Sequence, residues 1–252
     1  MPDQRAYLLA LAAGSPTPDW AAKVEWLEAQ GALRREDAAA KAAGLPDDGE
    51  ALARLTWGCG GGGIRLTHRH LDQTAVSAAW GGHLHVLAWL LEAQLLELHE
   101  DVFNAAARSG SVDLLAWLRQ RGCPWDSNAY SAAVDTGCEA VLEWLVEQGC
   151  PMEESGQPYL DACRWGDLGM VRCLRRLGVP WGPDGKVFFL AMERLTTPPQ
   201  LRWLLEEGCP VDYEAACKRV AGWREGGWHS AILQRAERVL TLLAEHGARR
   251  QP

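Results

Sequence analysis

The stretch that decides the fold is residues 132–151, AAVDTGCEAVLEWLVEQGCP. It joins a small-residue segment, a glycine, an apolar segment with Trp144-Leu145, and a closing Gly149-Cys150-Pro151. The same arrangement occupies residues 105–124, and it returns at 161–180 with Cys173 in the place of the tryptophan. Self-similarity at a fixed period indicates a repeat architecture, in which each unit buries its apolar face against its neighbours.

Each unit has the pattern of a helix–turn–helix. Val141, Leu142 and Leu145 form one apolar stripe of a helix with 3.6 residues per turn. Gly149 suits the left-handed position that ends a helix, and Pro151 cannot continue that helix. Alanines in the first segment of each unit allow helices to approach closely. The sequence therefore predicts an all-α fold, a solenoid of about seven or eight stacked helical hairpins.

The Trp-Leu pair marks the units along the chain. From Trp89 its position recurs after 28, 27, 29 and 30 residues, with Cys173 in place of the tryptophan at the third step, and the last step, to Leu242, is 39 residues. We predict a single solenoid over residues 1–252, with N-terminal repeats at 1–57, a glycine-rich break at 58–70, regular repeats at 71–208 and a C-terminal repeat with an inter-helix insertion at 209–252. The glycine-rich break is a candidate hinge.

The spacing Ala-Ala…Gly…Val-Leu-x-Trp-Leu-x-x-x-Gly-Cys, clearest between residues 71 and 178, resembles the ankyrin repeat family. The Thr-Pro-Leu-His opening typical of that family is absent, and the units are nearer 27–30 than 33 residues. The resemblance is to a short variety with Trp-Leu and Gly-Cys-Pro-Trp motifs. It implies short β-turn fingers between the hairpins and a concave face, lined by fingers and first helices, on which protein partners bind.

The charge and the apolar runs of the sequence argue against two classes of function, nucleic-acid binding and membrane spanning. The net charge of −8 argues against nucleic-acid binding, which depends on a basic face. The charge is uneven: residues 1–155 carry 22 acidic against 11 basic side chains, and residues 156–252 carry 11 against 14. No stretch reaches the 18 apolar residues of a membrane span. Residues 5–14 resemble a short secretory signal, but they fit equally as the first helix of a repeat, and we interpret them so.

The eight cysteines are predicted to be reduced. Cys123, Cys150 and Cys209 occupy the same position of different helical hairpins. Stacked helices lie about 8–10 Å apart, too far for the roughly 7 Å limit between Cα atoms of a disulfide. Reduced cysteines indicate a cytoplasmic or nuclear protein.

No motif predicts catalysis or a cofactor. His68, His70, His83 and His85 are the nearest to a metal cluster, but a helix separates the two pairs by roughly 15 Å, whereas zinc ligands converge on one ion. A structural or solvent-facing role is favoured for all four. Asp135-Thr136-Gly137 matches the aspartic-protease tripeptide only once, and that chemistry needs two carboxylates. The glycines at 60–63 lack the Lys-Ser/Thr of a phosphate-binding loop.

Thirteen tryptophans are the unusual feature of this composition. Six recur in one position of the second helix and are interpreted as packing residues: Trp26, Trp57, Trp89, Trp117, Trp144 and Trp203. Others break the repeat pattern. Packing within the chain remains an alternative for each, but as a set they favour a binding surface, since exposed Trp, Tyr and Arg anchor protein interfaces. The predicted partner-binding residues are Trp80, Arg108, Trp125, Tyr130, Asp135, Tyr159, Arg164, Trp165, Trp181, Trp223 and Trp228.

We therefore expect a monomeric, non-enzymatic module without cofactors that binds a protein partner on its concave face. The alternative is a scaffold segment of a larger assembly, which predicts a broad apolar outer surface. A remote alternative is an enzyme or metal site that uses the region of His68, His70, His83 and His85.

Overall fold

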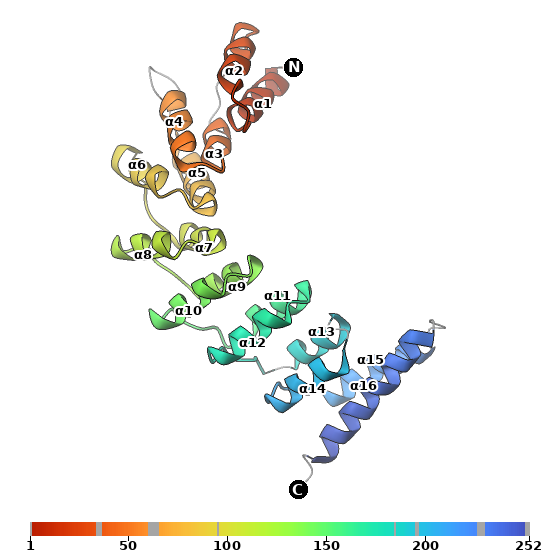
Figure 1. The fold of residues 1–252 in the computed structure, drawn as a ribbon. Helices are drawn as coiled ribbons and strands as arrows, with labels where there is room; N and C mark the ends of the chain where they lie inside the picture. Colours follow the sequence, from red (N-terminus) through yellow and green to blue (C-terminus); the bar gives the residue numbers. More distant parts are fainter. Residues whose placement is uncertain are drawn as a thin grey trace. The chain divides into compact units, whose positions relative to one another are not determined.

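The chain is described by a computed structural model at residues 2–33, 37–59, 66–94, 96–183, 185–194, 197–225 and 230–249 (Figure 1). All regular structure in these ranges is helical. The sixteen described helices are α1 (Pro2–Ala13), α2 (Trp20–Ala29), α3 (Asp37–Ala43), α4 (Asp48–Cys59), α5 (His68–Gly81), α6 (Leu84–Gln94), α7 (Glu100–Ser109), α8 (Val112–Gln120), α9 (Asn128–Asp135), α10 (Glu139–Glu147), α11 (Gln157–Trp165), α12 (Leu168–Arg176), α13 (Lys186–Arg194), α14 (Pro198–Glu206), α15 (Tyr213–Glu225) and α16 (Ser230–Arg249).

The helices pack in series as consecutive pairs, which confirms the predicted all-α fold. The chain divides into two compact units, Met1–Cys150 with α1 to α10 and Pro151–Pro252 with α11 to α16. We call them unit 1 and unit 2. The prediction of one continuous solenoid over the whole chain stays a prediction. No helix in the described ranges combines the length and the hydropathy needed to cross a bilayer.

In unit 1 the first helix of each pair packs against the first helix of the next. α1 contacts α3, α3 contacts α5, α5 contacts α7, and α7 contacts α9 (Figure 1). Alanine makes this close approach possible: Ala75, Ala78, Ala106 and Ala133 are completely buried. A larger side chain at these positions would have to displace the neighbouring helix, because protein interiors are closely packed.

The second helices carry the larger apolar side chains. Val141, Leu142 and Leu145 of α10 are completely buried, as the sequence pattern predicts. α10 ends at Gly149, which has a φ of +74°, and the next amide, that of Cys150, donates to the Leu145 carbonyl at 2.9 Å. This bond pattern is a Schellman motif, so the closing glycine has its expected role.

In unit 2 the loops between hairpins pack backbone against backbone. Gly156 and Gly182 both have positive φ, and a Cβ on Gly156 would lie 2.1 Å from the Trp181 carbonyl oxygen. A Cβ on Gly182 would lie 2.2 Å from the carbonyl oxygen of Ser155. Only glycine permits this approach, which fixes neighbouring loops against each other.

Two predicted features fall partly outside the described ranges. The glycine-rich break at 58–70 includes residues 60–65, which are not described, although Gly58 and Cys59 belong to the end of α4. The insertion in the last hairpin includes residues 226–229, also outside the described ranges.

Candidate functional site

Two tryptophans at the ends of first helices are open to solvent. Trp80, in the last turn of α5, is 64% exposed, and Trp165, the last residue of α11, is 69% exposed. Each precedes a helix-ending glycine in the left-handed conformation, Gly82 or Gly166. A tryptophan this exposed gains little from packing within the chain, which leaves its surface available to another molecule.

The same part of the neighbouring first helices is polar. Arg108 of α7, Asp135 of α9 and Arg164 of α11 each lie two residues before the glycine that follows the helix, the position that Trp80 has in α5. All three are exposed, as predicted. The Arg108 Nη2 and Asp135 Oδ2 atoms form an ion pair at 3.1 Å. We call these exposed ends the first-helix surfaces, one in each unit: Trp80, Arg108 and Asp135 form that of unit 1, and Arg164 and Trp165 form that of unit 2.

A groove of about 580 Å³ lies beside Trp80, lined by residues of the first three hairpins: Gly14, Asp37, Ala40, Lys41, Gly44, Gln73, Ser77, Trp80 and Gly81. It contains one cation, one carboxylate and two neutral polar side chains in addition to the indole. The groove beside Trp80 therefore favours neither a positively nor a negatively charged ligand.

Tyr130 and Tyr159 do not face solvent, so the expectation that they contact a partner is wrong for this conformation. Their exposed fractions are 1% and 0%. The Tyr130 hydroxyl donates to the Cys150 carbonyl at 3.0 Å, and the Tyr159 hydroxyl donates to the Val179 carbonyl at 2.9 Å. Both hydroxyls satisfy a buried carbonyl at the end of their own hairpin, which gives them a structural role.

Trp181 is also buried, at 8% exposed, against the sequence expectation. Its ring stacks on Tyr159 with centroids 4.0 Å apart, and its indole N–H donates to the Glu207 carbonyl at 3.4 Å. The loop that carries it folds back over α11, because the backbones of the two neighbouring loops are in contact at Gly156 and Gly182.

Trp125 is half-buried, so it too is less exposed than the sequence predicted. It packs edge-on against Phe103, with centroids 5.5 Å apart, and against Trp144 at 6.3 Å. The Arg119 guanidinium covers its ring at 3.9 Å. Three intramolecular contacts make Trp125 a packing residue rather than a free anchor.

The remaining tryptophans differ in how far they are exposed to solvent. Trp223 is half-buried, and Trp228 lies outside the described residues. Of the six repeat-position tryptophans, five are half-buried, but Trp26 is 63% exposed, so packing does not account for it. Trp26 lies on α2, the second helix of its hairpin.

The four histidines serve separate local roles. His68 and His70 lie in the first turn of α5. His83 is buried and its Nε2–H donates to the Leu45 carbonyl. His85 Nδ1 lies 2.6 Å from Asp48 Oδ2, and the same carboxylate accepts from the backbone amides of His85 and Val86. The described residues contain no group of three potential metal ligands.

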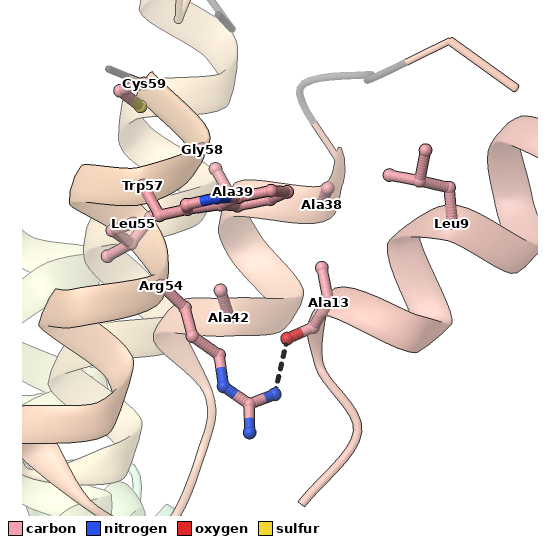
Figure 2. A pocket seen from close by; sticks show the side chains of 10 residues that line it. All are labelled: Leu9, Ala13, Ala38, Ala39, Ala42, Arg54, Leu55, Trp57, Gly58 and Cys59. Atoms are coloured by element: carbon pink, nitrogen blue, oxygen red, sulfur yellow. Dashed lines mark hydrogen bonds between the residues drawn. The ribbon is translucent and has the colours of Figure 1, made fainter. Parts of the chain in front are cut away.

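One buried cation joins the first two hairpins. Arg54 of α4 is 2% exposed, and its Nη1 donates to the carbonyls of Ala13 at 2.8 Å and Ser15 at 2.6 Å. Figure 2 shows this guanidinium reaching the end of α1 beside a cavity, with the Trp57 ring lying over small alanine side chains. The cavity has a volume of about 10 Å³, enough for about one water molecule. The Arg54 contacts therefore make this place a structural joint between hairpins.

The cysteines are free, as predicted. Burial raises the pKa of the Cys123, Cys150, Cys163 and Cys209 thiols from 9.0 to about 12. The Cys123 and Cys150 sulfurs lie 3.6 Å and 3.5 Å from the carbonyl oxygens of His99 and Asp126 in the preceding loop. Because nucleophilic attack requires the thiolate, these four thiols are structural and unreactive near neutral pH.

A sequence signal for the buried tyrosines exists. Phe103, Tyr130, Tyr159 and Phe188 follow one another at steps of 27, 29 and 29 residues, and all four are almost completely buried. A fixed aromatic position in the first helix therefore marks core rather than surface. Arg54 and Asp48 have no equivalent signal, since neither recurs at the repeat spacing.

Neither a scan against protein-family models nor a search of curated proteins finds a match to this chain.

Proposed function

We propose that this chain is a non-enzymatic, ankyrin-type repeat module that binds protein through the first-helix surfaces of its two units. The observation that carries the proposal is the exposure of Trp80 and Trp165, at 64% and 69%, at the same end of two first helices. Large aromatic side chains are enriched among the residues that contribute most to protein–protein binding energy. In the ankyrin family, which the repeat spacing resembles, these surfaces correspond to the concave face.

The helical framework supports rigid recognition. Alanine contacts between first helices and the buried hydrogen bonds of Tyr130 and Tyr159 fix the backbone before a partner arrives. Side chains held by such a framework lose little conformational entropy on binding, so more of the contact free energy remains as affinity.

The test is affinity capture from cell extract with quantitative mass spectrometry, using wild-type protein and the variants Trp80→Ala and Trp165→Ala. We expect recovery of the specific partner to fall by about tenfold or more, since loss of an interface anchor costs about 2 kcal/mol. Melting temperatures should stay close to wild type because both side chains are exposed.

Trp26→Ala is the matched control, because Trp26 is 63% exposed but lies on a second helix. Its capture should equal that of wild type. If Trp26→Ala reduces recovery as much as the other two variants, the captured proteins adhere to any exposed indole and the proposed surfaces are wrong.

A specific observation also favours the second candidate, a scaffold segment of a larger assembly. Of the seven exposed large apolar side chains in the described residues, five lie in the first hairpin and the segment after it: Tyr7, Leu8, Leu11, Trp26 and Leu33. Exposed apolar side chains that gather in this way are typical of a surface that another protein covers. Partner capture that is lost in Leu8→Glu but retained in Trp80→Ala and Trp165→Ala would favour this candidate over the first.

A further inference from the structure

A second groove, in unit 2, has one sign of charge. It has a volume of about 570 Å³ and lies between α13 and α15, lined by Phe189, Ala215, Lys218, Arg219, Gly222 and Trp223. α11 packs closely against α13, whereas α13 and α15 approach each other less closely. The groove is thus a place where the stacking of first helices loosens.

One of the two positive charges along this groove, that of Arg219, is held by a defined contact. The Arg219 side chain is 53% exposed and pairs with Glu193 of α13, with Nη2 and Oε1 2.6 Å apart. This ion pair joins α13 to α15 and fixes the Arg219 guanidinium at the edge of the groove. Lys218, the neighbouring residue, is exposed and forms no ion pair with any residue in the described ranges.

The other described lining residues are apolar. Phe189 and Trp223 are half-buried aromatic side chains on the two helices that border the groove, and Ala215 and Gly222 add little bulk. None of the described lining residues carries a carboxylate. A ligand that matches this lining presents carboxylates beside apolar side chains.

The wider charge distribution favours the same ligand. Residues 1–150 carry 20 acidic and 11 basic side chains, a net charge of −9, whereas residues 151–252 carry 13 and 14, a net charge of +1. An acidic ligand is repelled by unit 1 and not by unit 2, so electrostatic steering directs it to unit 2.

We propose that the α13–α15 groove binds an acidic segment of a protein partner, with a carboxylate at Lys218 and an apolar side chain between Phe189 and Trp223. This inference rests on the proposed function as a protein-binding module and names the chemistry of the partner. The α13–α15 groove is separate from the residues of the first-helix surfaces, so the groove and those surfaces can be tested independently.

The probe is a fluorescein-labelled peptide, acetyl-Glu-Leu-Phe-Glu-Asp-Leu-amide, titrated with the full-length protein by fluorescence polarisation at about 50 mM salt. The comparison peptide has lysine in place of each acidic residue. We expect saturable binding of the acidic peptide only, and a loss of affinity as salt shortens the Debye length from about 14 Å to about 8 Å. Lys218→Glu should weaken binding at least tenfold, because attraction becomes repulsion at contact distance.

Arg238→Glu is the matched control. Arg238 is an exposed arginine on α16 of the same unit. Its replacement by glutamate changes the net charge by as much as Lys218→Glu does, but it leaves the lining of the α13–α15 groove unchanged. Its affinity for the acidic peptide should stay within about twofold of wild type, apart from long-range effects that salt removes. Melting temperatures of both variants establish that they are folded.

Three results would overturn the inference: no saturable binding of the acidic peptide at about 1 mM protein, equal binding of the lysine peptide, or equal weakening by Arg238→Glu and Lys218→Glu. If one of these occurs while Trp80→Ala and Trp165→Ala still reduce partner capture, the proposed function stands and only the acidic chemistry is wrong. If capture is also unaffected by those variants, the proposed function fails with it.

Discussion

Two tyrosine hydroxyls tie a first helix to the loop at the end of its hairpin, one in each unit. Tyr130 and Tyr159 each donate to a carbonyl 20 residues further along the chain. A buried carbonyl without a donor costs free energy, so the hydroxyl contributes to stability beyond the packing of its ring.

Removing one hydroxyl should weaken the fold measurably. We expect Tyr159→Phe to lower the free energy of unfolding by about 1–3 kcal/mol, because the Val179 carbonyl then remains buried without a donor. The measurement is urea denaturation followed by circular dichroism. Tyr7→Phe, at a position that is 57% exposed, is the control and should change the stability little. Equal effects of the two variants would contradict the structural role of the Tyr159 hydroxyl.

At the scale of elements, the loops of unit 2 depend on glycines at which backbones meet. Gly149 and Gly156 provide a comparison, since both have positive φ but only Gly156 faces another backbone. A Cβ on Gly149 meets nothing within 4 Å, whereas one on Gly156 meets the Trp181 carbonyl. The two positions separate the cost of a left-handed backbone from the cost of a clash.

Gly149→Ala should lower the free energy of unfolding by roughly 1–2 kcal/mol, the cost of placing a Cβ in the left-handed region. Gly156→Ala should cost at least about 2 kcal/mol more, because the loop that carries Trp181 must also move. Thermal and urea unfolding of the two variants measure the difference. If both variants lose the same stability, the close packing of these loops is not a requirement of the fold.

At the scale of the whole molecule, buried thiols occur in both units. Cys123 and Cys150 belong to unit 1, and Cys163 and Cys209 belong to unit 2. In all four, burial raises the pKa of the thiol from 9.0 to about 12. Burial likewise raises the pKa of the Tyr130 and Tyr159 hydroxyls above the ordinary value of 10.0.

These shifts predict that stability falls as pH rises. Well below pH 9 the thiols are protonated in both the folded and unfolded states. Between pH 9 and about 12 the unfolded chain releases protons that the folded chain retains, so the free energy of unfolding decreases across this window. Urea midpoints at pH 8, 9.5 and 11 measure the effect, and Cys209→Val should reduce the slope. A midpoint that does not change with pH would show that the thiols titrate normally.

A structural feature could be predicted from the sequence where it depends only on residues close by in the chain. The helix pairs, their order and the closing glycines were predictable, because apolar periodicity and left-handed glycines are local properties that recur in every hairpin. The exposure of Trp80, Arg108, Asp135, Arg164 and Trp165 was also predictable, since these positions vary at the end of a helix whose other positions are small. The protein partner and its acidic chemistry both remain proposals.

The burial of Trp181 and the partial burial of Trp125 were decided only by tertiary structure. Neither follows the repeat spacing that marks Tyr130 and Tyr159 as core, and each is covered by a side chain contributed from elsewhere in the chain: Trp144 against Trp125, and Tyr159 against Trp181. The amino-acid sequence determines which segments become helices because that choice depends on nearby residues. Tertiary structure alone decides how far the two loop tryptophans are covered, because that depends on which loop folds back over which helix.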